Sequence, residues 1–377
     1  MFRASTVRNR LISLFFSFMA GAISVIFTHR TISNPEANLS SWHVNYDLGF
    51  VRRGLQGELL AILTNTTGLS WLWAESILRS IAVVILIYLG AMKSLGNHPV
   101  RHQIWIFAIF PLGPLYFIFD PGGSGSTDAI FLLFAYLTFW FWNGDRGHLE
   151  ATGLVVASVL LSLIHEGYVL FFSALALLIW ITKGHTLNRF RFMIWWAAIS
   201  TPFIIQVVGA LFLPKVDFSY FCKLATSRSI PADCRPLVFF GEMELGEAIT
   251  YSTTRLSLLP TIVFAIWALA SLVLAIMILQ TLPTHKPQNM NLKTRIGTVL
   301  LMYAVSLPIF FVGSDWGRWL SVISMLFVIC FAHFATNPLS PKAIKLIIAS
   351  SLLPVISSTG SGLAGVVFWL PWIFTML

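Results

Sequence analysis

Apolar runs long enough to cross a lipid bilayer recur along nearly the whole chain, and they constrain its fold more than any other feature. A helix needs about 20 consecutive apolar residues to span the hydrocarbon core. Only 10% of the 377 residues are charged and 57% are hydrophobic, so the chain cannot cover a water-facing surface as a soluble domain does. The sequence therefore predicts an all-α, polytopic transmembrane helical bundle that forms a single integral membrane domain over residues 1–377.

The first apolar run follows a short basic N-terminus and is not preceded or followed by a convincing cleavage site. We interpret residues 11–28 as an uncleaved signal anchor whose N-terminus is cytoplasmic. The apolar tail 363–377 is either a final span or a re-entrant segment, so the prediction is about 10 to 12 spans. The remaining predicted spans are 71–92, 104–119, 129–142, 151–164, 168–182, 194–213, 259–282, 296–312, 319–335 and 343–357.

Charged residues are distributed unequally between the two sides of this topology. Every predicted inside segment carries Lys or Arg, as the positive-inside rule expects, whereas Asp145 and Glu150 are the only acids placed inside. The formal net charge of +9 therefore reports membrane orientation and gives no reason to expect a nucleic-acid partner. We expect a bacterial inner (plasma) membrane protein with outer loops at 29–70 and 214–258.

The segment 45–58 in the first outer loop combines Asp47 with two adjacent arginines and three glycines. Asp47 can contact a substrate or form a local ion pair with Arg52 and Arg53. Adjacent guanidinium groups favour a phosphate ligand, because each fork binds two oxygens at once. Apolar residues at helical spacing follow and predict an interfacial amphipathic helix in this loop: Leu55, Leu59, Leu60 and Leu63.

Three further polar groups are predicted at the same outer surface. Asp128 ends the glycine-rich connection 120–128, where it is either a helix N-cap or a substrate-binding residue. His165 and Glu166 interrupt an apolar run and serve either as a buried structural pair or in binding and proton transfer. The third group lies in the connection 313–319, where Asp315 and Arg318 either pair along one helical turn or divide, with Arg318 binding a phosphate.

The three cysteines are too few for a disulfide scaffold. Cys222 and Cys234 lie in the outer loop 214–258 and can form a disulfide, which their spacing permits without requiring it. Cys330 lies in an apolar span and is predicted to be a packing residue.

Familiar nucleotide and metal motifs are missing from the sequence. The glycine-rich segment 122–126 lacks the lysine and the preceding strand of a P-loop, and Glu166 has no second histidine to complete a zinc motif. We therefore expect neither a cofactor nor a metal; the alternative is a metal held by Asp47, Asp120 or Asp128, which would need all-oxygen ligation. An active site at the outer face has no access to cytosolic nucleotide sugars, so its substrate must arrive already activated, most simply as a lipid-linked phosphate in the membrane.

This layout resembles the polytopic glycosyltransferases of the GT-C type, which use polyprenyl-phosphate sugars, and it also resembles bacterial surface-polysaccharide polymerases. In that family a long outer loop follows the first span and carries an early acidic residue, which Tyr46-Asp47 matches here. The resemblance implies that Asp47 is the general base, with His165 and Glu166 assisting catalysis. It further implies that Arg52, Arg53, Asp128, Asp315 and Arg318 bind substrate. The implied partners are a lipid-linked sugar donor, a glycan or lipid acceptor, and membrane lipids.

A transporter or flippase for an anionic lipid-linked saccharide is the alternative function. Transporters bind their substrates near the bilayer midplane at broken helices, and Pro111, Pro114 and Pro202 can break helices in this chain. Against this alternative, the charged residues are predicted at one face of the membrane, and the two halves of the chain show no clear repeat.

Overall fold

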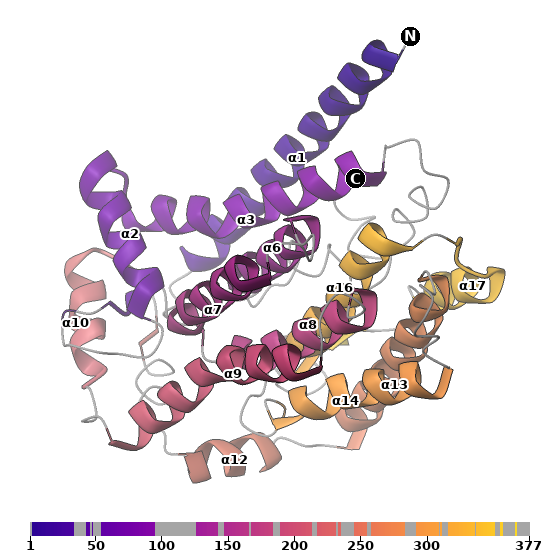
Figure 1. Ribbon diagram of the computed structural model, residues 1–377. Coiled ribbons are helices and arrows are strands. Elements are labelled where there is room, and N and C mark those ends of the chain that lie inside the picture. The colour runs from indigo at the N-terminus through magenta and orange to yellow at the C-terminus, as the bar shows by residue number, and fades with distance from the viewer. Residues whose placement is uncertain are drawn as a thin grey trace.

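The computed structural model places most of the chain in helices that pack into one bundle (Figure 1). The residues that the structure describes are 2–33, 43–45, 47, 54–94, 126–141, 147–165, 167–183, 189–212, 217–230, 233–234, 245–254, 258–282, 292–308, 310, 316–335, 337–350, 355–356 and 366–367. The predicted span 104–119 lies outside these residues.

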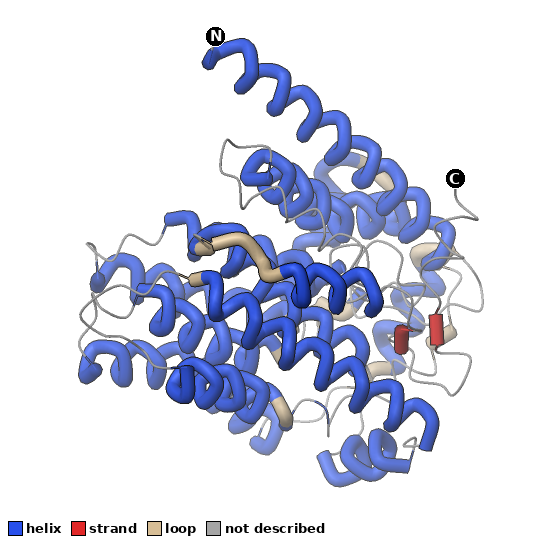
Figure 2. The backbone as a smooth tube through the Cα atoms, turned by 90° about the vertical axis from the view of Figure 1, so that its right-hand side faces the viewer, coloured by secondary structure: helices blue, strands red, loops and turns tan. Residues whose placement is uncertain are grey.

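The prediction of an all-α membrane protein is confirmed. In the described part of the chain the strand structure consists of a single antiparallel pair of two-residue strands, β1 and β2 (Figure 2). The helices are α1 (Phe2–Ile32), α2 (Gly54–Thr67), α3 (Trp71–Ser94), α6 (Ser126–Phe141), α7 (Gly147–Ile164), α8 (Tyr168–Lys183), α9 (Arg189–Phe212), α10 (Ser219–Ser227), α12 (Leu245–Thr254), α13 (Leu258–Thr281), α14 (Leu292–Ser306), α16 (Trp316–Phe334) and α17 (Pro341–Ser350), and the strands are β1 (Val355–Ile356) and β2 (Val366–Val367).

Three described helices are long and apolar enough to cross a bilayer, with candidate spans at Ser13–Arg30, Trp71–Leu89 and Thr261–Thr281. Five shorter apolar helical segments accompany them in the described residues: Asp128–Phe139, Thr152–Ile164, Leu170–Thr182, Ile296–Ser306 and Trp319–Phe334. Many large apolar side chains point away from the bundle, including Phe18 at 73% exposure on α1 and Phe190 at 71% on α9. Apolar surface of this extent suits contact with lipid tails rather than water.

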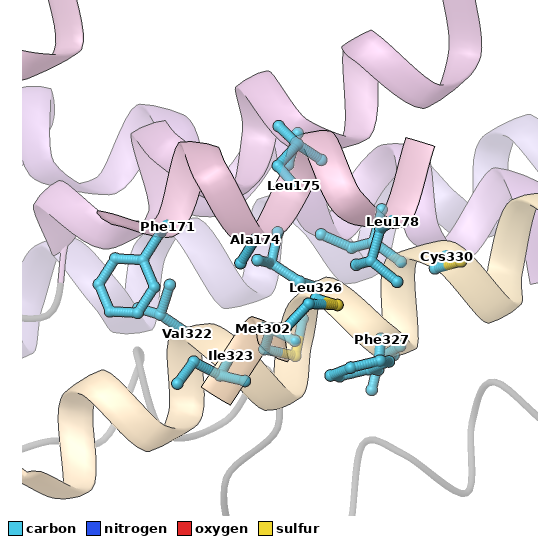
Figure 3. Close-up of a cluster of buried hydrophobic side chains, with 14 of the residues drawn as sticks. Phe171, Ala174, Leu175, Leu178, Met302, Val322, Ile323, Leu326, Phe327 and Cys330 are labelled. Atoms are coloured by element: carbon cyan, nitrogen blue, oxygen red, sulfur yellow. The ribbon is translucent and has the colours of Figure 1, made fainter. Parts of the chain in front are cut away.

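The core of the bundle lies between α8 and α16, which Figure 3 shows in close-up. Phe171 and Leu178 of α8 face Val322 and Phe327 of α16 across this interface (Figure 3). Cys330 is fully buried at one end of the same cluster, so its predicted role as a packing residue is confirmed. The central helices thereby hold the beginnings of α8 and α16 next to each other.

Helix α1 crosses α3 closely, while its N-terminal half extends away from the bundle (Figure 1). A Cβ atom on Gly21 would lie 2.5 Å from a methyl carbon of Val84, so glycine lets the two helices approach. One turn further on, Ser80 Oγ donates a hydrogen bond to Ser24 Oγ at 3.0 Å. Small residues and interhelical hydroxyl bonds are typical of helix pairs in membranes.

The predicted helix in the first outer loop is present as α2, but its buried side differs from the leucine face. Leu60 is buried, whereas Leu59 is 46% exposed and the buried set also includes the polar residues Gln56 and Thr64. The reason is Gly57, where a Cβ atom would overlap the carbonyl oxygen of Val44. This close backbone contact fixes the rotation of α2 and leaves part of its apolar side exposed, as an interfacial helix requires.

Two predicted spans near the C-terminus end earlier than expected. Helix α14 ends at Ser306, and Leu307 forms a turn inside the predicted span 296–312. Helix α17 ends at Ser350, and β1 at Val355–Ile356 occupies the end of the predicted span 343–357. Strand β2 lies within the tail 363–377 and pairs with β1. In the second segment the apolar composition predicted too long a helix, because apolar residues also suit strands.

Candidate functional site at one end of the bundle

The segment that precedes α2 presents Asp47 to solvent from a buried stretch of chain. His43, Val44 and Asn45 are all buried, and the backbone N–H of Asp47 donates to Asn45 Oδ1 at 3.3 Å. The carboxylate itself is exposed and accepts a hydrogen bond from the hydroxyl of Tyr220, on α10, at 3.4 Å. Asp47 is thus an accessible acid on a firmly packed backbone.

A cation and an aromatic ring accompany Asp47. The guanidinium carbon of Arg228, at the end of α10, lies 3.5 Å from the ring centroid of Trp71, which begins α3. Burial lowers the pKa of Arg228, and the negative charge of Asp47 raises it again. Together these residues form an exposed carboxylate, a half-buried arginine and an indole ring at one surface, which we call the Asp47 cluster (Asp47, Trp71, Tyr220 and Arg228).

A second charged group lies beneath this surface, and we call it the buried triad (His43, Glu75 and Arg79). Glu75 is fully buried, and its carboxylate lies 2.9 Å from His43 Nε2. The same carboxylate forms an ion pair with the guanidinium of Arg79, which is one helical turn further along α3. Both partners are also buried, with side-chain exposures of 3% and 4%. The triad ties the chain just before Asp47 to the beginning of α3, because His43 and Glu75 are held as a pair.

The buried triad, Trp71 and Arg228 are not among the site residues predicted from the sequence. Glu75 and Arg79 carry a signal in the sequence, since two charges at i and i+4 within an apolar helix are costly unless they pair. The contact of Arg228 with Trp71 joins residues far apart in the chain, and no local pattern predicts it.

Asp128 lies in the first turn of α6, which begins at Ser126, so it is not the helix N-cap. It is fully buried and accepts a hydrogen bond from the hydroxyl of Tyr168 at 2.8 Å. Tyr168 is the first residue of α8, so this bond joins the beginnings of two helices. The buried carboxylate therefore has a structural partner, whichever other role it plays.

His165 lies in the connection between α7 and α8 and is 6% exposed. Its Nδ1 accepts a hydrogen bond from the backbone N–H of Gly167 at 3.1 Å, so a neutral ring carries its proton on Nε2. The ring packs edge-on against Trp319 at 5.1 Å and next to Tyr168 at 5.2 Å. The structure thus brings together Asp128, His165 and the beginning of α16.

The remaining predicted site residues are described in part or not at all. Arg318 belongs to α16, beside Trp319, and its side chain lies outside the described residues. Arg52, Arg53, Glu166 and Asp315 also lie outside them.

Apolar contacts join the Asp47 cluster to the region of Asp128. Leu60 of α2 packs with Ala74 of α3, and Trp71 and Ile130 pack against this pair. Ile130 lies half a turn beyond Asp128 on α6. Trp71, which contacts Arg228, therefore packs against the same pair of residues as Ile130 at the beginning of α6, and both polar regions lie at the same end of the bundle.

Comparison with known proteins places the chain among membrane proteins. A family model described as uncharacterised membrane protein Rv1490 matches residues 11–238, a segment that contains Asp47, Asp128, His165 and Arg228. Similar proteins are the uncharacterized protein Rv1490 of Mycobacterium tuberculosis and the uncharacterized protein Mb1527 of Mycobacterium bovis, each 29% identical over 173 residues. The alignment covers 42% of this chain and 37% of each relative, so the chain spans well under half of their length. No solved structure matches it. Because the family model covers more than half of the sequence, the chain belongs to the family of the membrane protein Rv1490.

Proposed function

We propose that the protein is a glycosyltransferase or polysaccharide polymerase that acts at the outer face of a bacterial inner membrane. The donor is a sugar linked to polyprenyl phosphate, and the acceptor is a glycan or a lipid. The observation that carries this proposal is the Asp47 cluster, in which an exposed carboxylate lies beside an arginine and an indole ring. Such a transfer needs a general base, a cationic group that binds the donor phosphate, and a surface on which the sugar ring stacks.

The orientation follows from the distribution of charge. Arg3, Arg8 and Arg10 precede the candidate span Ser13–Arg30 and place the N-terminus in the cytoplasm under the positive-inside rule. The segment that contains Asp47 follows this span and so lies on the opposite side. Exposed Leu59 and Ile62 on α2 would then rest in the outer leaflet, next to a donor carried by its lipid chain.

In the proposed reaction the carboxylate of Asp47 takes the proton of an acceptor hydroxyl. The hydroxyl oxygen bonds to the anomeric carbon of the donor sugar while the bond from that carbon to the phosphate oxygen breaks. The polyprenyl phosphate leaves with the bonding electrons, and Arg228 stabilises its charge through charge-assisted hydrogen bonds. Arg52, Arg53 and Arg318 remain predicted to add further phosphate contacts.

The decisive test is Asp47→Asn, with Asp217→Asn as its matched control. Asp217 is another exposed aspartate next to α10, and its Oδ1 accepts the N–H of Ser219 at 2.8 Å, a bond that asparagine can keep. We expect Asp47→Asn to lower glycosyl transfer about 10²- to 10⁴-fold, the usual contribution of a general base, and the control to leave transfer unchanged. Full transfer by Asp47→Asn at normal expression would exclude the proposed base.

The membrane leaflet in which the lipid-linked precursor accumulates in a deletion strain distinguishes the glycosyltransferase from the alternative, a flippase. A missing transferase leaves unextended lipid-linked precursor in the outer leaflet, whereas a missing flippase leaves it in the inner leaflet. The position of the buried charges does not separate the two functions. Glu75 lies roughly 6 Å from the start of α3, a helix of roughly 36 Å, but Arg79 lies roughly 12 Å from it, so Arg79 is nearer the middle of the helix, the level at which transporters bind substrate.

A further inference from the structure

Two cysteines lie close together beneath the Asp47 cluster. Cys222 is on α10, and Cys234 follows the loop that leaves this helix. Both are half-buried and pack against the same apolar group, which includes Val44 and Phe221. The thiol of Cys222 donates to the carbonyl oxygen of Cys234 at 3.7 Å.

Between the two cysteines, residues 225–230 form a defined turn at the end of α10. Helix α10 ends in a Schellman motif, in which the N–H of Ser229 bonds to the carbonyl of Thr226 and the N–H of Ile230 bonds to that of Ala225. Ile230 is buried in the apolar group that the cysteines contact. Arg228 lies between the two cysteines in the sequence. A bond that joined Cys222 to Cys234 would therefore also hold the Arg228 guanidinium against the ring of Trp71.

We propose that Cys222 and Cys234 are a redox modification site that closes into a disulfide and holds Arg228 in the Asp47 cluster. The proposal takes the outer location of this loop from the proposed function, but it needs neither the glycosyl donor nor the transfer reaction. An oxidising compartment outside the membrane is where such bonds form and persist.

The closure proceeds by exchange with an external disulfide, carried by a protein or a small molecule. One cysteine attacks a sulfur of this oxidant as the thiolate, forming a mixed disulfide and releasing the first oxidant thiol. The second cysteine then attacks the protein sulfur of the mixed disulfide and releases the other oxidant thiol. The protein loses two electrons and two protons, and the oxidant gains them. Burial raises the pKa of the Cys222 thiol to about 12, which keeps this thiol protonated and slows its attack as a thiolate.

The test is thiol labelling of the full-length protein, denatured directly from membranes under acid quench, with a maleimide that shifts its mass. All three cysteines are free thiols in the structure, and Cys330 serves as the internal reference, because it is buried in the bundle far along the chain from the other two. We expect the unreduced protein to be labelled at Cys330 alone and the reduced protein at all three cysteines. Cys222→Ser should expose Cys234 to the label without reduction, and Cys234→Ser should expose Cys222. Labelling of all three cysteines in the unreduced wild type would overturn the proposal.

A second readout does not depend on labelling. The loop closed by the bond is short, and removal of such a bond lowers the melting temperature of a chain of this size by roughly 5 °C. We expect reductant to produce this shift in the wild type and in Cys330→Ala, and to produce none in the double variant Cys222→Ser/Cys234→Ser. An equal shift in the double variant would overturn the proposal. Neither readout involves glycosyl transfer, so failure here is distinct from failure of the proposed reaction.

Discussion

The buried triad and the Asp47 cluster are made from the same chemical groups but differ in exposure. Each has a carboxylate and an arginine. Trp71, a member of the Asp47 cluster, connects the two groups: its ring centroid is 3.5 Å from the guanidinium carbon of Arg228 and 6.1 Å from the ring centroid of His43 in the triad. Glu75 is fully buried between two basic partners, whereas Asp47 is exposed and has a long 3.4 Å bond to Tyr220. The comparison indicates that one group holds the loop in place while the other is open to a ligand.

Energetics supports this division of roles. A buried ion pair contributes little net stability compared with apolar residues, but removing one partner leaves an uncompensated charge. An exposed carboxylate suffers no such penalty, because water solvates it and its neighbours. Mutations in the triad should therefore change folding, and mutations in the Asp47 cluster should change chemistry.

The largest effect on stability is expected for Glu75→Ala. The change strips Arg79 and His43 of their shared partner inside the protein, and breaking a buried pair typically costs about 3–5 kcal/mol. Asp47→Ala should cost less than about 0.5 kcal/mol, as is usual for an exposed position. Thermal unfolding in detergent micelles measures both. Equal destabilisation by the two variants would contradict the division between the regions.

The next effect concerns the backbone that joins the two regions. Gly57→Ala would drive a Cβ atom into the carbonyl oxygen of Val44, between the triad and Asp47. Because a backbone atom cannot swing aside, we expect a cost of about 3 kcal/mol, at the upper end for overpacking. Gly153→Ala, on α7, is the matched control, since nothing lies within 4 Å of the point that its Cβ atom would occupy. It should stabilise the protein by up to about 1 kcal/mol. If the two alanine variants melted alike, α2 would not rest on this segment.

The same glycine shows what could be predicted from the sequence and what could not. The apolar runs in the sequence predict the ends of α3, α8 and α16 to within a few residues, because a backbone in lipid must satisfy its own hydrogen bonds and therefore forms a helix. The buried side of α2 could not be predicted, because a contact with Val44 outweighs the spacing of the leucines. Leucine periodicity reports the apolar side of a helix, and in a membrane that side can face lipid.

The candidate site divides in a similar way. Asp47, Asp128 and His165 could be found in the sequence, since polar residues stand out in an apolar chain. Their partners could not, because Tyr220, Tyr168 and Trp319 meet them only through tertiary packing. Tyrosine and tryptophan are also common at membrane interfaces, so their presence alone indicates no contact.

A smaller effect is expected for Tyr168→Phe, which tests whether Asp128 belongs with the buried groups. The change removes the hydroxyl that donates to the Asp128 carboxylate at 2.8 Å, and bonds to charged groups are worth about 1.5–3 kcal/mol. We expect a loss near 1.5 kcal/mol, because Asp128 takes part in further interactions. Tyr303→Phe is the control, since its hydroxyl bonds to the neutral hydroxyl of Ser271. The control should lose about 0.5–1 kcal/mol. A larger loss in the control would argue against an ionised Asp128.

The smallest predicted effect is a gain in stability from Ser229→Gly, at the turn that carries Arg228 into the Asp47 cluster. Ser229 has a φ of +55°, a left-handed conformation that strains residues with a Cβ atom and that glycine adopts freely. It occupies the position after α10 where helices most often have glycine, so relief of strain should outweigh the added freedom of the unfolded chain. We expect a gain of about 0.5–1 kcal/mol. Ser227→Gly, in the last turn of α10, should instead lose about 0.5 kcal/mol, because its backbone is helical. Thermal unfolding separates the two outcomes by sign, and a loss in both variants would mean that the backbone of Ser229 is not strained at this turn.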